Sequence, residues 1–536
     1  VRRYDDYVAL ARSQQQTREV LRAERGRIFS QDKIGTRYPL AVNKQFVTVY
    51  AVPKLIQDPS VAAVALAPIL DRSVEELTPR LEKSDDPYEL LARGLDETIA
   101  GRISSLNLPG VNATREIARS YPASSTAAQV LGFVGYRGDD RVGQYGLEGF
   151  YEEVLRGAAG SFVGAKDATR GKLFTGSQEF TEPRPGADLV LTIDQNVQFK
   201  VEEVLAAVAE RWSVARGTAI VLDPKTGRIL ALAATPTFNP NSYGSVSDID
   251  VFRNYAIQAR FEPGSVFKPI TMAAGIDAGV IAPSTTYEDT GARTFGRYTI
   301  RNFDERARGV QTMTQVIEHS LNTGAVYVEE LLGHERFRDY VERFGFGRKP
   351  GIDLAGEAAG DLANLRTSRD VNFATASFGQ GIAVTPLEMA SAIGAIANGG
   401  KLMRPFVVDR IVYPDGRETI TQPAVIAEPV GREAAGLTAA MMVSAVDNGY
   451  DRARVPGYSV AGKTGTAQIP KPGEGYEEDF IHSFAGFAPA FDPKFLILLE
   501  IERPRGIAFA SNSLTPSFRD LTKFLLDYYE VPPDRR

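Results

Sequence analysis

The second half of the chain alternates apolar runs with amphipathic stretches. Segment 187–194 (ADLVLTID) is almost continuously apolar and predicts a strand, and Gln195–Glu210 carries Val and Leu at helical spacing, which predicts a helix. Two apolar runs around DPKTG within 217–234 predict a β-hairpin. Segment 483–502 predicts two buried strands, followed by a last helix with an apolar face along 518–528. Strands at both ends with helices between them predict one antiparallel sheet packed by helices, an α+β fold.

Helix starts are visible as capping residues. Thr385–Glu388 (TPLE) combines an N-cap, a proline at the first helical position and a capping-box Glu, and Asn398–Gly400 supplies a stop. In the first half, Asp58-Pro59 predicts another capped start, and Ser73–Glu76 reads as a capping box. We therefore expect a well-defined helix over residues 386–397 and short helices after the two earlier caps.

The first half has no long dominant element. Short β-like pieces such as Phe46–Val52 alternate there with short helices. The sequence PRPG at 183–186 interrupts this pattern, and stronger signals follow it. We place the domain boundary there, with an extended mixed α/β domain over 1–185 and a second domain over 186–536.

Composition excludes several classes of function. The chain has 61 Lys and Arg against 67 Asp and Glu, so there is no basic excess for nucleic acid. No cysteine is present, which excludes disulfides, a thiolate nucleophile and Cys-based zinc sites. The three histidines, His319, His334 and His482, are isolated, and we expect structural or solvated roles for them. No apolar run reaches bilayer length, and the Val1 start before a charged stretch suggests that an N-terminal signal or anchor was removed.

Three short motifs together describe a serine acyl-transfer site without histidine. They are Ser265-Val-Phe-Lys268, Ser320-Leu-Asn322 and Lys463-Thr464-Gly465-Thr466. A serine hydroxyl needs a base within hydrogen-bond reach, and on a helix the amine of Lys268 lies one turn from Ser265. Lysine acts as a base only when neutral, so burial or a nearby positive charge, for which Lys463 is the candidate, must lower its pKa.

The local sequence supports this assignment. Phe261–Gly264 (FEPG) forces a turn, and the helical segment after it places Ser265 at a helix N-terminus, where free N–H groups favour a developing oxyanion. Lys463–Thr466 follows YSVAG and precedes AQI, which predicts a strand lining a cleft.

A second set of matching motifs occurs in the same order and tests the assignment. Ser30-Gln-Asp-Lys33 is followed by Gly and Pro, Ser105-Leu-Asn107 precedes Leu-Pro-Gly, and Lys225-Thr-Gly227 lies at the tip of the predicted hairpin. None has the context that the chemistry requires. We interpret these three matches as structural.

Over nearly its whole length the sequence resembles the class B penicillin-binding proteins, the membrane-anchored D,D-transpeptidases that cross-link peptidoglycan. Segments similar to that family include RFEPGSVFKPIT, HSLNTGAVYVEELLG, FGFGRKPGIDLAGE, SFGQGIAVTPLEMA and VAGKTGTAQIP. In the first half, Arg25–Ile28, Arg119–Pro122 and Gly143–Glu148 are similar to patches of the family's non-catalytic pedestal. The resemblance implies a pedestal over 1–185, of the dimerisation or partner-binding type, and a β-lactamase-like transpeptidase domain over 186–536.

The resemblance also implies a role for each motif residue. Ser265 would attack the penultimate D-Ala carbonyl while Lys268 takes its proton, and Ser320 would relay a proton to the leaving amine. Asn322 would bind the acyl amide and help to position Lys268. The terminal carboxylate would be bound by the segment Lys463, Thr464, Gly465 and Thr466, with backbone N–H groups of Ser265 and Thr466 as the oxyanion hole. No metal or organic cofactor is implied.

The resemblance further implies partners and location. Expected partners are stem peptides, β-lactams, a membrane-embedded glycan polymerase and other division or elongation proteins. The catalytic domain would lie outside the cytoplasm, held to the cell membrane by an N-terminal anchor. The Ser-x-Asn motif and the KTGTAQ context favour division-type over elongation-type members. A β-lactamase, and a β-lactam sensor or non-catalytic scaffold, remain the alternatives.

Overall fold

The computed structural model describes residues 16–138, 140–167, 171–172, 179–471 and 475–535, which form two compact units. Unit 1 comprises the described residues up to Arg27 together with Ala41–Pro122 and Ala158–Arg184. Unit 2 comprises Ile28–Leu40, Ala123–Gly157 and the chain from Pro185 onward. The last crossing between the units thus falls at the predicted boundary, whereas two earlier segments pack with unit 2. The division into a pedestal and a catalytic domain stays a prediction.

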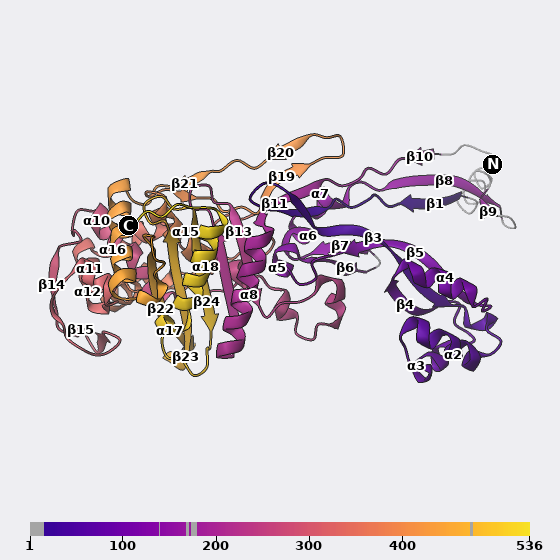
Figure 1. Ribbon diagram of the computed structural model, residues 1–536, viewed down its shortest axis with the longest axis horizontal. Coiled ribbons are helices and arrows are strands. Elements are labelled where there is room, and N and C mark those ends of the chain that lie inside the picture. The colour runs from indigo at the N-terminus through magenta and orange to yellow at the C-terminus, as the bar shows by residue number, and fades with distance from the viewer. Residues whose placement is uncertain (1–15, 139, 168–170, 173–178, 472–474, 536) are drawn as a thin grey trace, which may run out of the picture. The chain divides into compact units, whose positions relative to one another are not determined.

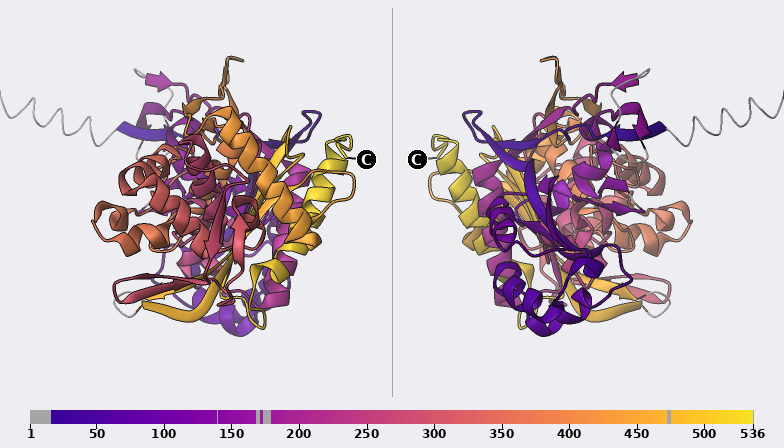
Figure 2. Two further views of the ribbon diagram at one scale, coloured as in Figure 1. Left: turned by 90° about the vertical axis from the view of Figure 1, so that its left-hand side faces the viewer. Right: turned by 90° about the vertical axis from the view of Figure 1, so that its right-hand side faces the viewer.

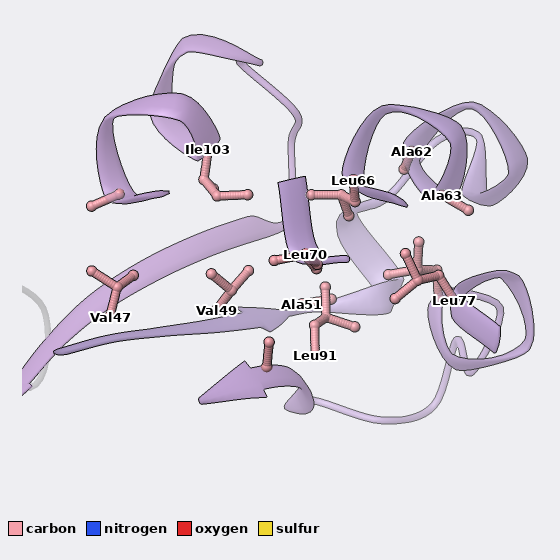
Figure 3. Packing of buried hydrophobic residues seen from close by; sticks show 13 residues of the cluster. Val47, Val49, Ala51, Ala62, Ala63, Leu66, Leu70, Leu77, Leu91 and Ile103 are labelled. Carbon is pink, nitrogen blue, oxygen red and sulfur yellow. The ribbon is translucent and has the colours of Figure 1, made fainter. Parts of the chain in front are cut away.

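Unit 1 contains a small helical subdomain built on three antiparallel strands. β3 (Arg37–Ala51) pairs antiparallel with β4 (Glu89–Leu95) and β5 (Val111–Ser120), and α2 (Pro59–Leu70), α3 (Val74–Leu81) and α4 (Glu97–Ser105) cover these strands. Their apolar side chains interlock in one buried cluster (Figure 3), which includes Val47, Val49, Leu66, Leu70, Leu77, Leu91 and Ile103. A second antiparallel sheet in unit 1 comprises β1 (Gln16–Leu21), β8 (Gly160–Asp167), β9 (Gly171–Lys172) and β10 (Glu179–Thr181).

The predicted caps in unit 1 form. The Asp58 carboxylate accepts a hydrogen bond from the Val61 N–H at 3.0 Å, with Pro59 at the start of α2. The Ser73 hydroxyl accepts from the Glu76 N–H at 3.1 Å. The Glu76 carboxylate pairs with Arg72 on the surface, so the predicted box at Ser73 forms only in its serine half.

Unit 2 is organised around a five-stranded antiparallel sheet (Figure 1). Its order is β13 (Ile229–Thr235), β12 (Arg216–Leu222), β24 (Phe495–Glu502), β23 (Gly475–Ala488) and β22 (Ala461–Lys471). This confirms the antiparallel sheet expected from the alternating pattern, including the hairpin of β12 and β13 and the strand that carries the Lys463 motif. β22 forms one edge of the sheet.

Two groups of helices pack against this sheet (Figures 1 and 2). One group is α8 (Gln195–Trp212) with α18 (Thr515–Tyr528), and the other is α15 (Pro386–Ala397) with α16 (Arg432–Asn448), against which α10 (Lys268–Asp277) packs. A Cβ at Gly217 would lie 3.1 Å from Leu205 of α8, whereas Leu222, five positions along the same strand, faces Gly394 of α15. Because side chains of a strand alternate between faces, the two groups cover opposite faces.

The predicted helix starts in unit 2 are confirmed. α8 begins after Asp194, whose carboxylate accepts from the N–H groups of Asn196 and Val197, and it runs to Trp212. Thr385 and Glu388 form the complete capping box of α15. The helix ends at Asn398, as the sequence predicts.

One prediction about the sheet was wrong. The strand over 187–194 exists as β11 (Asp188–Asp194), but it does not belong to the five-stranded sheet. It pairs antiparallel with β19 (Val408–Val412) and parallel with β2 (Ile28–Gln31). Its continuous apolar run reflects burial on both faces, which a periodicity argument cannot assign to a particular sheet.

The remaining elements connect and cover these layers. They include α5 (Ala128–Leu131), α6 (Gly146–Phe150), α7 (Glu152–Arg156), α11 (Met313–Glu318), α12 (Asn322–Leu332), α13 (His334–Arg343), α14 (Asp370–Ala376) and α17 (Ala510–Ser513). Four two-stranded sheets stand apart: β6 (Phe133–Arg137) with β7 (Asp140–Gln144), β14 (Thr286–Asp289) with β17 (Gly309–Thr312), β15 (Ala292–Phe295) with β16 (Tyr298–Arg301), and β18 (Leu402–Met403) with β21 (Val425–Ala427). Among the described residues, no helix is both long and apolar enough to span a bilayer.

Candidate active site

Ser265 lies in a tight turn directly before a buried helix. A 3₁₀ turn, η4 (Gly264–Phe267), leads into α10, so the α-helix begins at Lys268 rather than at Ser265 as expected. Gly264 has a φ of +58° and donates its N–H to the Gly379 carbonyl at 2.9 Å. Left-handed backbone at this position favours glycine and fixes the turn that presents the serine.

Lys268 is placed as a base for Ser265. Its ammonium nitrogen lies 2.9 Å from the Ser265 hydroxyl oxygen, and the side chain is 0% exposed. The same nitrogen donates to the Ser320 carbonyl at 2.5 Å and lies 3.2 Å from the Ser320 hydroxyl. Burial, and then the positive charge of Lys463, lower the pKa of Lys268 well below its ordinary range. Both causes favour the neutral amine, which carries a lone pair, over the ammonium.

The second motif spans the connection between α11 and α12. Ser320 has a φ of +56°, in the left-handed region that non-glycine residues rarely adopt. The chain reverses here, which turns the hydroxyl of Ser320 toward both lysines.

The start of α12 is capped by a residue distant in sequence. The Asn302 side-chain oxygen accepts from the N–H groups of Asn322 at 3.0 Å and Thr323 at 3.3 Å. The Asn302 amide nitrogen donates to both oxygens of Asp289, at 2.9 and 3.0 Å. Both residues are 1% exposed, so this buried pair fixes the backbone of the second motif. No sequence pattern indicated it.

Asn322 lies two positions after Ser320 in sequence, but its side chain points elsewhere. Its side-chain nitrogen donates to the Arg301 carbonyl at 2.8 Å. The hydrogen-bond partners described for the Lys268 amine are Ser265 and Ser320. No hydrogen bond described for the Lys268 amine involves Asn322, and the positioning role that the family resemblance implied for Asn322 stays a prediction.

The third motif lies on the edge strand β22. Lys463 is 0% exposed, and its ammonium lies 2.9 Å from the Ser320 hydroxyl. It also donates to the Tyr450 hydroxyl at 2.7 Å and the Thr464 carbonyl at 3.0 Å. Ser320 therefore receives both lysines on one oxygen. Tyr450, just after α16, was not identified from the sequence, because a tyrosine after an apolar helix reads as ordinary packing.

Glycine is required in the third motif for packing. A Cβ at Gly465 would lie 2.3 Å from the Ser483 hydroxyl, 2.7 Å from the Pro263 carbonyl and 3.2 Å from the Val266 nitrogen. Its absence lets β22 approach the turn that carries the nucleophile. Further along, the Thr466 hydroxyl accepts from the Ala510 N–H at 3.1 Å, which ties the strand to α17.

The second motif set has none of this organisation. The buried Ser30 hydroxyl donates to Gln195 at 2.5 Å, whereas Lys33 donates to the Tyr528 carbonyl at 2.7 Å. The Ser105 hydroxyl bonds to Arg102 within α4, and Lys225 pairs with Asp492 at the hairpin tip. The interpretation of these matches as structural is confirmed.

The histidines take structural positions, as expected. His482 is 0% exposed, and its Nδ1 lies 2.9 Å from the Ser513 hydroxyl. His334 stacks on Phe373 with ring centroids 4.0 Å apart, and His319 is exposed. Within the described ranges, the titratable group that contacts the Ser265 hydroxyl is therefore an amine.

Comparison with known families agrees with this geometry. Residues 217–523 match the penicillin-binding protein transpeptidase domain, and residues 20–191 match the penicillin-binding protein dimerisation domain. Among relatives, Stage V sporulation protein D of Bacillus subtilis is 34% identical over 517 residues, covering 95% of this chain and 79% of that protein. Penicillin-binding protein PbpB of Mycobacterium tuberculosis is 32% identical, covering 84% of this chain and 68% of that protein.

Solved structures give the same result. A peptidoglycan synthetase from Bifidobacterium adolescentis is similar with a TM-score of 0.74 at 25% identity, covering 97% of this chain and 98% of that one. Penicillin binding protein 3 of Mycobacterium tuberculosis, complexed with aztreonam, is similar with a TM-score of 0.73 at 27% identity, covering 96% and 98%. Along this chain, the match to the dimerisation domain comes before the match to the transpeptidase domain. The chain therefore belongs to the class B penicillin-binding proteins, which carry a dimerisation domain before a transpeptidase domain.

Proposed function

We propose that this protein is a serine D,D-transpeptidase that cross-links peptidoglycan stem peptides through an acyl-enzyme on Ser265. The observation that carries the proposal is the fully buried Lys268 amine, 2.9 Å from the Ser265 hydroxyl and held low in pKa. Relatives named as probable peptidoglycan D,D-transpeptidases in Pseudomonas aeruginosa and Neisseria meningitidis support the reaction class.

The acylation step follows from the contacts of Ser265. The neutral Lys268 amine takes the hydroxyl proton while the oxygen attacks the penultimate D-Ala carbonyl. The carbonyl oxygen becomes an oxyanion, which the backbone N–H groups of Ser265 and Thr466 stabilise. When the C–N bond breaks, the leaving D-Ala amine takes a proton through Ser320, whose oxygen bridges the two lysines.

The second half-reaction reuses the same groups. The amine of a second stem peptide attacks the ester carbonyl and loses its proton to the lysine and serine network. The Ser265 oxygen leaves and regains a proton from Lys268, which restores the starting state. One amide is broken and one is formed, so no oxidant, metal or nucleotide is needed for the balance.

Charge and hydrogen bonds would orient the donor peptide. The buried Lys463 supplies positive potential behind the strand, and Thr464 and Thr466 present hydroxyl groups for the terminal carboxylate. Asn322 would receive the acyl amide. β-Lactams would acylate Ser265 because their reactive amide mimics the D-Ala-D-Ala end of the stem peptide. Penicillin binding protein 3 of Mycobacterium tuberculosis has been solved with aztreonam and with ampicillin.

The biological setting is part of the proposal. Relatives that include Stage V sporulation protein D and an FtsI homolog, together with the Ser-x-Asn motif, favour a division-type enzyme. Such an enzyme would act outside the cytoplasm at the cell membrane. It would work beside a membrane-embedded glycan polymerase, with residues 1–185 as the partner-binding pedestal and 186–536 as the catalytic domain.

Covalent labelling tests the proposed nucleophile. Wild-type protein should gain one penicilloyl adduct, which peptide mapping places on Ser265, and Ser265→Ala should gain none. Ser30→Ala, which alters the unrelated serine of the second motif set, should label normally. An adduct that survives in Ser265→Ala would refute the assignment.

The reaction after acylation separates the alternatives. A transpeptidase should hold the penicilloyl adduct for many turnover times and should join a stem-peptide donor to an amine acceptor. Rapid hydrolysis of the adduct would instead indicate a β-lactamase. A stable adduct without any transfer to an acceptor would indicate a sensor or a non-catalytic scaffold.

A further inference from the structure

The Lys463 ammonium uses all its hydrogen atoms inside the protein. It is fully buried, and its three shortest contacts are with the Ser320 hydroxyl at 2.9 Å, the Tyr450 hydroxyl at 2.7 Å and the Thr464 carbonyl at 3.0 Å, while the Thr464 hydroxyl lies farther away at 3.5 Å. An ammonium group has three hydrogens, so the three shortest contacts match them one to one. Two of these three acceptors belong to motif residues, whereas Tyr450 lies outside every motif.

Tyr450 contacts this ammonium through its hydroxyl rather than its ring face. The nitrogen lies 2.7 Å from the phenol oxygen and 5.1 Å from the ring centroid. An atom so near the oxygen lies beyond the ring edge, so the contact is a hydrogen bond with Tyr450 as acceptor. The tyrosine is 8% exposed, and its own N–H donates to the Ala445 carbonyl of α16 at 2.9 Å. The phenol is therefore fixed in place.

We infer that Tyr450 is a positioning residue for this reaction: its hydroxyl holds the Lys463 ammonium against Ser320, where the charge acts on the amine that serves as base. The inference rests on the proposed function. Without the hydroxyl, the buried ammonium loses its shortest hydrogen bond and keeps the Ser320 hydroxyl, the Thr464 carbonyl and the more distant Thr464 hydroxyl. A buried cation that loses its strongest partner either moves or gives up its charge. Both responses weaken the positive potential at Lys268.

The consequence can be measured in the pH dependence of acylation. Lys268 is active when neutral, so the acylation rate rises with pH through its pKa. Burial and the Lys463 charge both lower that pKa. Weakening the effect of the Lys463 charge raises the pKa of Lys268. The acidic limb of the rate profile therefore moves to higher pH.

In the part of the chain that the structure describes, the other titratable side chains near the motifs make no hydrogen bond or ion pair with the Lys268 amine. The Glu318 carboxylate of α11 accepts from Ser444 and Asn448 of α16. His319 is exposed, and His482 of β23 faces Ser513 of α17. The shift in the limb thus reports on Lys463 and Tyr450.

The test compares two tyrosine hydroxyls in the same unit. Tyr450→Phe removes the acceptor of Lys463, and Tyr340→Phe removes a hydroxyl that donates to Asp277 at 2.8 Å. Both tyrosines are 8% exposed, so the two variants match in burial, although the Tyr450 hydroxyl also donates a long hydrogen bond of 3.5 Å to the Ile317 carbonyl. The second-order rate constant for acylation by benzylpenicillin is measured by intact mass across pH. We expect Tyr450→Phe to lose about tenfold at neutral pH and to shift its acidic limb upward, with Tyr340→Phe unchanged.

The outcomes separate this inference from the proposed function. Failure of wild-type protein to acylate at Ser265 would remove the proposed function itself. Normal wild-type acylation, with a Tyr450→Phe profile that coincides with those of wild type and Tyr340→Phe, would overturn the role of Tyr450. An equal rate loss in both variants with no shift in the limb would also overturn it, because that pattern indicates a general effect on packing.

A second measurement covers the case in which Tyr450→Phe does not fold. A single 3-fluorotyrosine in place of Tyr450 keeps the hydrogen bond but withdraws electron density from its oxygen. We expect an upward shift of the acidic limb in the same direction but smaller. An unchanged limb would contradict the inference.

Discussion

At the scale of single residues, the proposed chemistry depends on an amine whose pKa is held low inside the protein. Lys268 is fully buried beside a second buried lysine, and both point at the oxygen of Ser320. Burial disfavours the charged amine and a neighbouring cation disfavours it further. The arrangement costs stability, because the unfolded chain binds a proton that the folded chain excludes. Such strain is typical of sites where the perturbed group does chemistry.

Removing the base should separate binding from chemistry. We expect Lys268→Ala to acylate about 100- to 10,000-fold more slowly while still binding a penicillin reversibly. Time-resolved intact mass measures the first quantity, and competition with a fluorescent penicillin measures the second. Lys225→Ala is the control, since that lysine lies in the hairpin-tip ion pair. Normal adduct formation in Lys268→Ala would exclude Lys268 as the base.

His482 provides a residue-scale test of folding rather than chemistry. Burial lowers its pKa from an ordinary 6.5 to about 4. Between these values the unfolded chain binds a proton that the folded chain rejects, so its contribution to stability is complete above pH 6.5 and is lost as pH falls toward 4. We expect the unfolding free energy of wild type, relative to His482→Gln, to fall by roughly 3 kcal/mol between pH 7 and pH 4.

The unfolding free energy of wild type must be compared with that of His482→Gln at the same pH, because other groups also titrate. Burial raises the pKa values of Glu329 and Glu500 to about 8, which produces the opposite slope with pH. Denaturant unfolding of wild type, His482→Gln and the exposed His319→Gln at each pH isolates the histidine. A constant difference between wild type and His482→Gln would show that His482 titrates alike in both states.

At the scale of elements, the site is the contact between an edge strand and a turn. β22 approaches η4 closely because Gly465 has no side chain, and α12 starts where Asn302 caps it. Each motif therefore lies at the boundary of a regular element: a turn before a helix, a helix start and an edge strand. Hydrogen bonds from segments distant in the sequence place these boundaries against one another.

A methyl group at Gly465 should disturb this contact. Gly465→Ala would bring its Cβ to 2.7 Å from the Pro263 carbonyl, so strand and turn must separate. We expect about a 100-fold loss in acylation rate, the size of effect that a displacement near 1 Å produces. Gly436→Ala is the control, because that glycine is exposed within α16 with no atom within 4 Å. It should acylate normally and gain roughly 1 kcal/mol in stability. A normal acylation rate in Gly465→Ala would contradict this prediction, because it would mean that β22 and the turn before α10 accommodate the methyl group without displacing the motif residues.

At the scale of the whole molecule, unit 2 draws on parts of the chain that precede residue 185. β2 pairs with β11, and the Gln129 amide donates to the Val251 carbonyl at 3.2 Å. Phe133 stacks on Tyr243 with ring centroids 4.3 Å apart. Unit 2 is thus discontinuous in sequence, although the linear pattern shows a single change at PRPG.

Two deletions test this arrangement. The fragment 186–536 lacks β2 and the packing of Phe133, so we expect it to lose cooperative unfolding and acylation. Deletion of 53–109 removes the helical subdomain of unit 1 instead. Its ends lie together, since the Val52 N–H donates to the Gly110 carbonyl at 2.6 Å, and a short glycine linker can join them. That protein should still acylate. Calorimetry measures the cooperativity of unfolding, and intact mass measures the acylation, of each deletion protein. A 186–536 fragment that acylates and unfolds cooperatively would contradict the discontinuous unit.

The sequence by itself determined the chemistry and most elements. The motif residues Ser265 and Lys268 require each other at one-turn spacing, and that local rule needs no tertiary information. Capping residues such as Thr385 set helix ends through bonds within four positions. The flanking segments YSVAG and AQI placed β22 correctly as a strand. All of these signals are local, which is why they can be read along a chain.

Tertiary structure alone decided the remaining features. Asn302, Tyr450 and the partners of β11 act across large separations, and their residue types are common in ordinary packing. Lys463 is buried, whereas Lys225, in a similar Lys-Thr-Gly sequence, forms an ion pair at the surface. The segments that fold over each lysine decide this difference. A lysine becomes a base only when the whole fold removes water from it and sets a second charge beside it. That electrostatic condition is a property of the assembled unit, and no short stretch of sequence carries it.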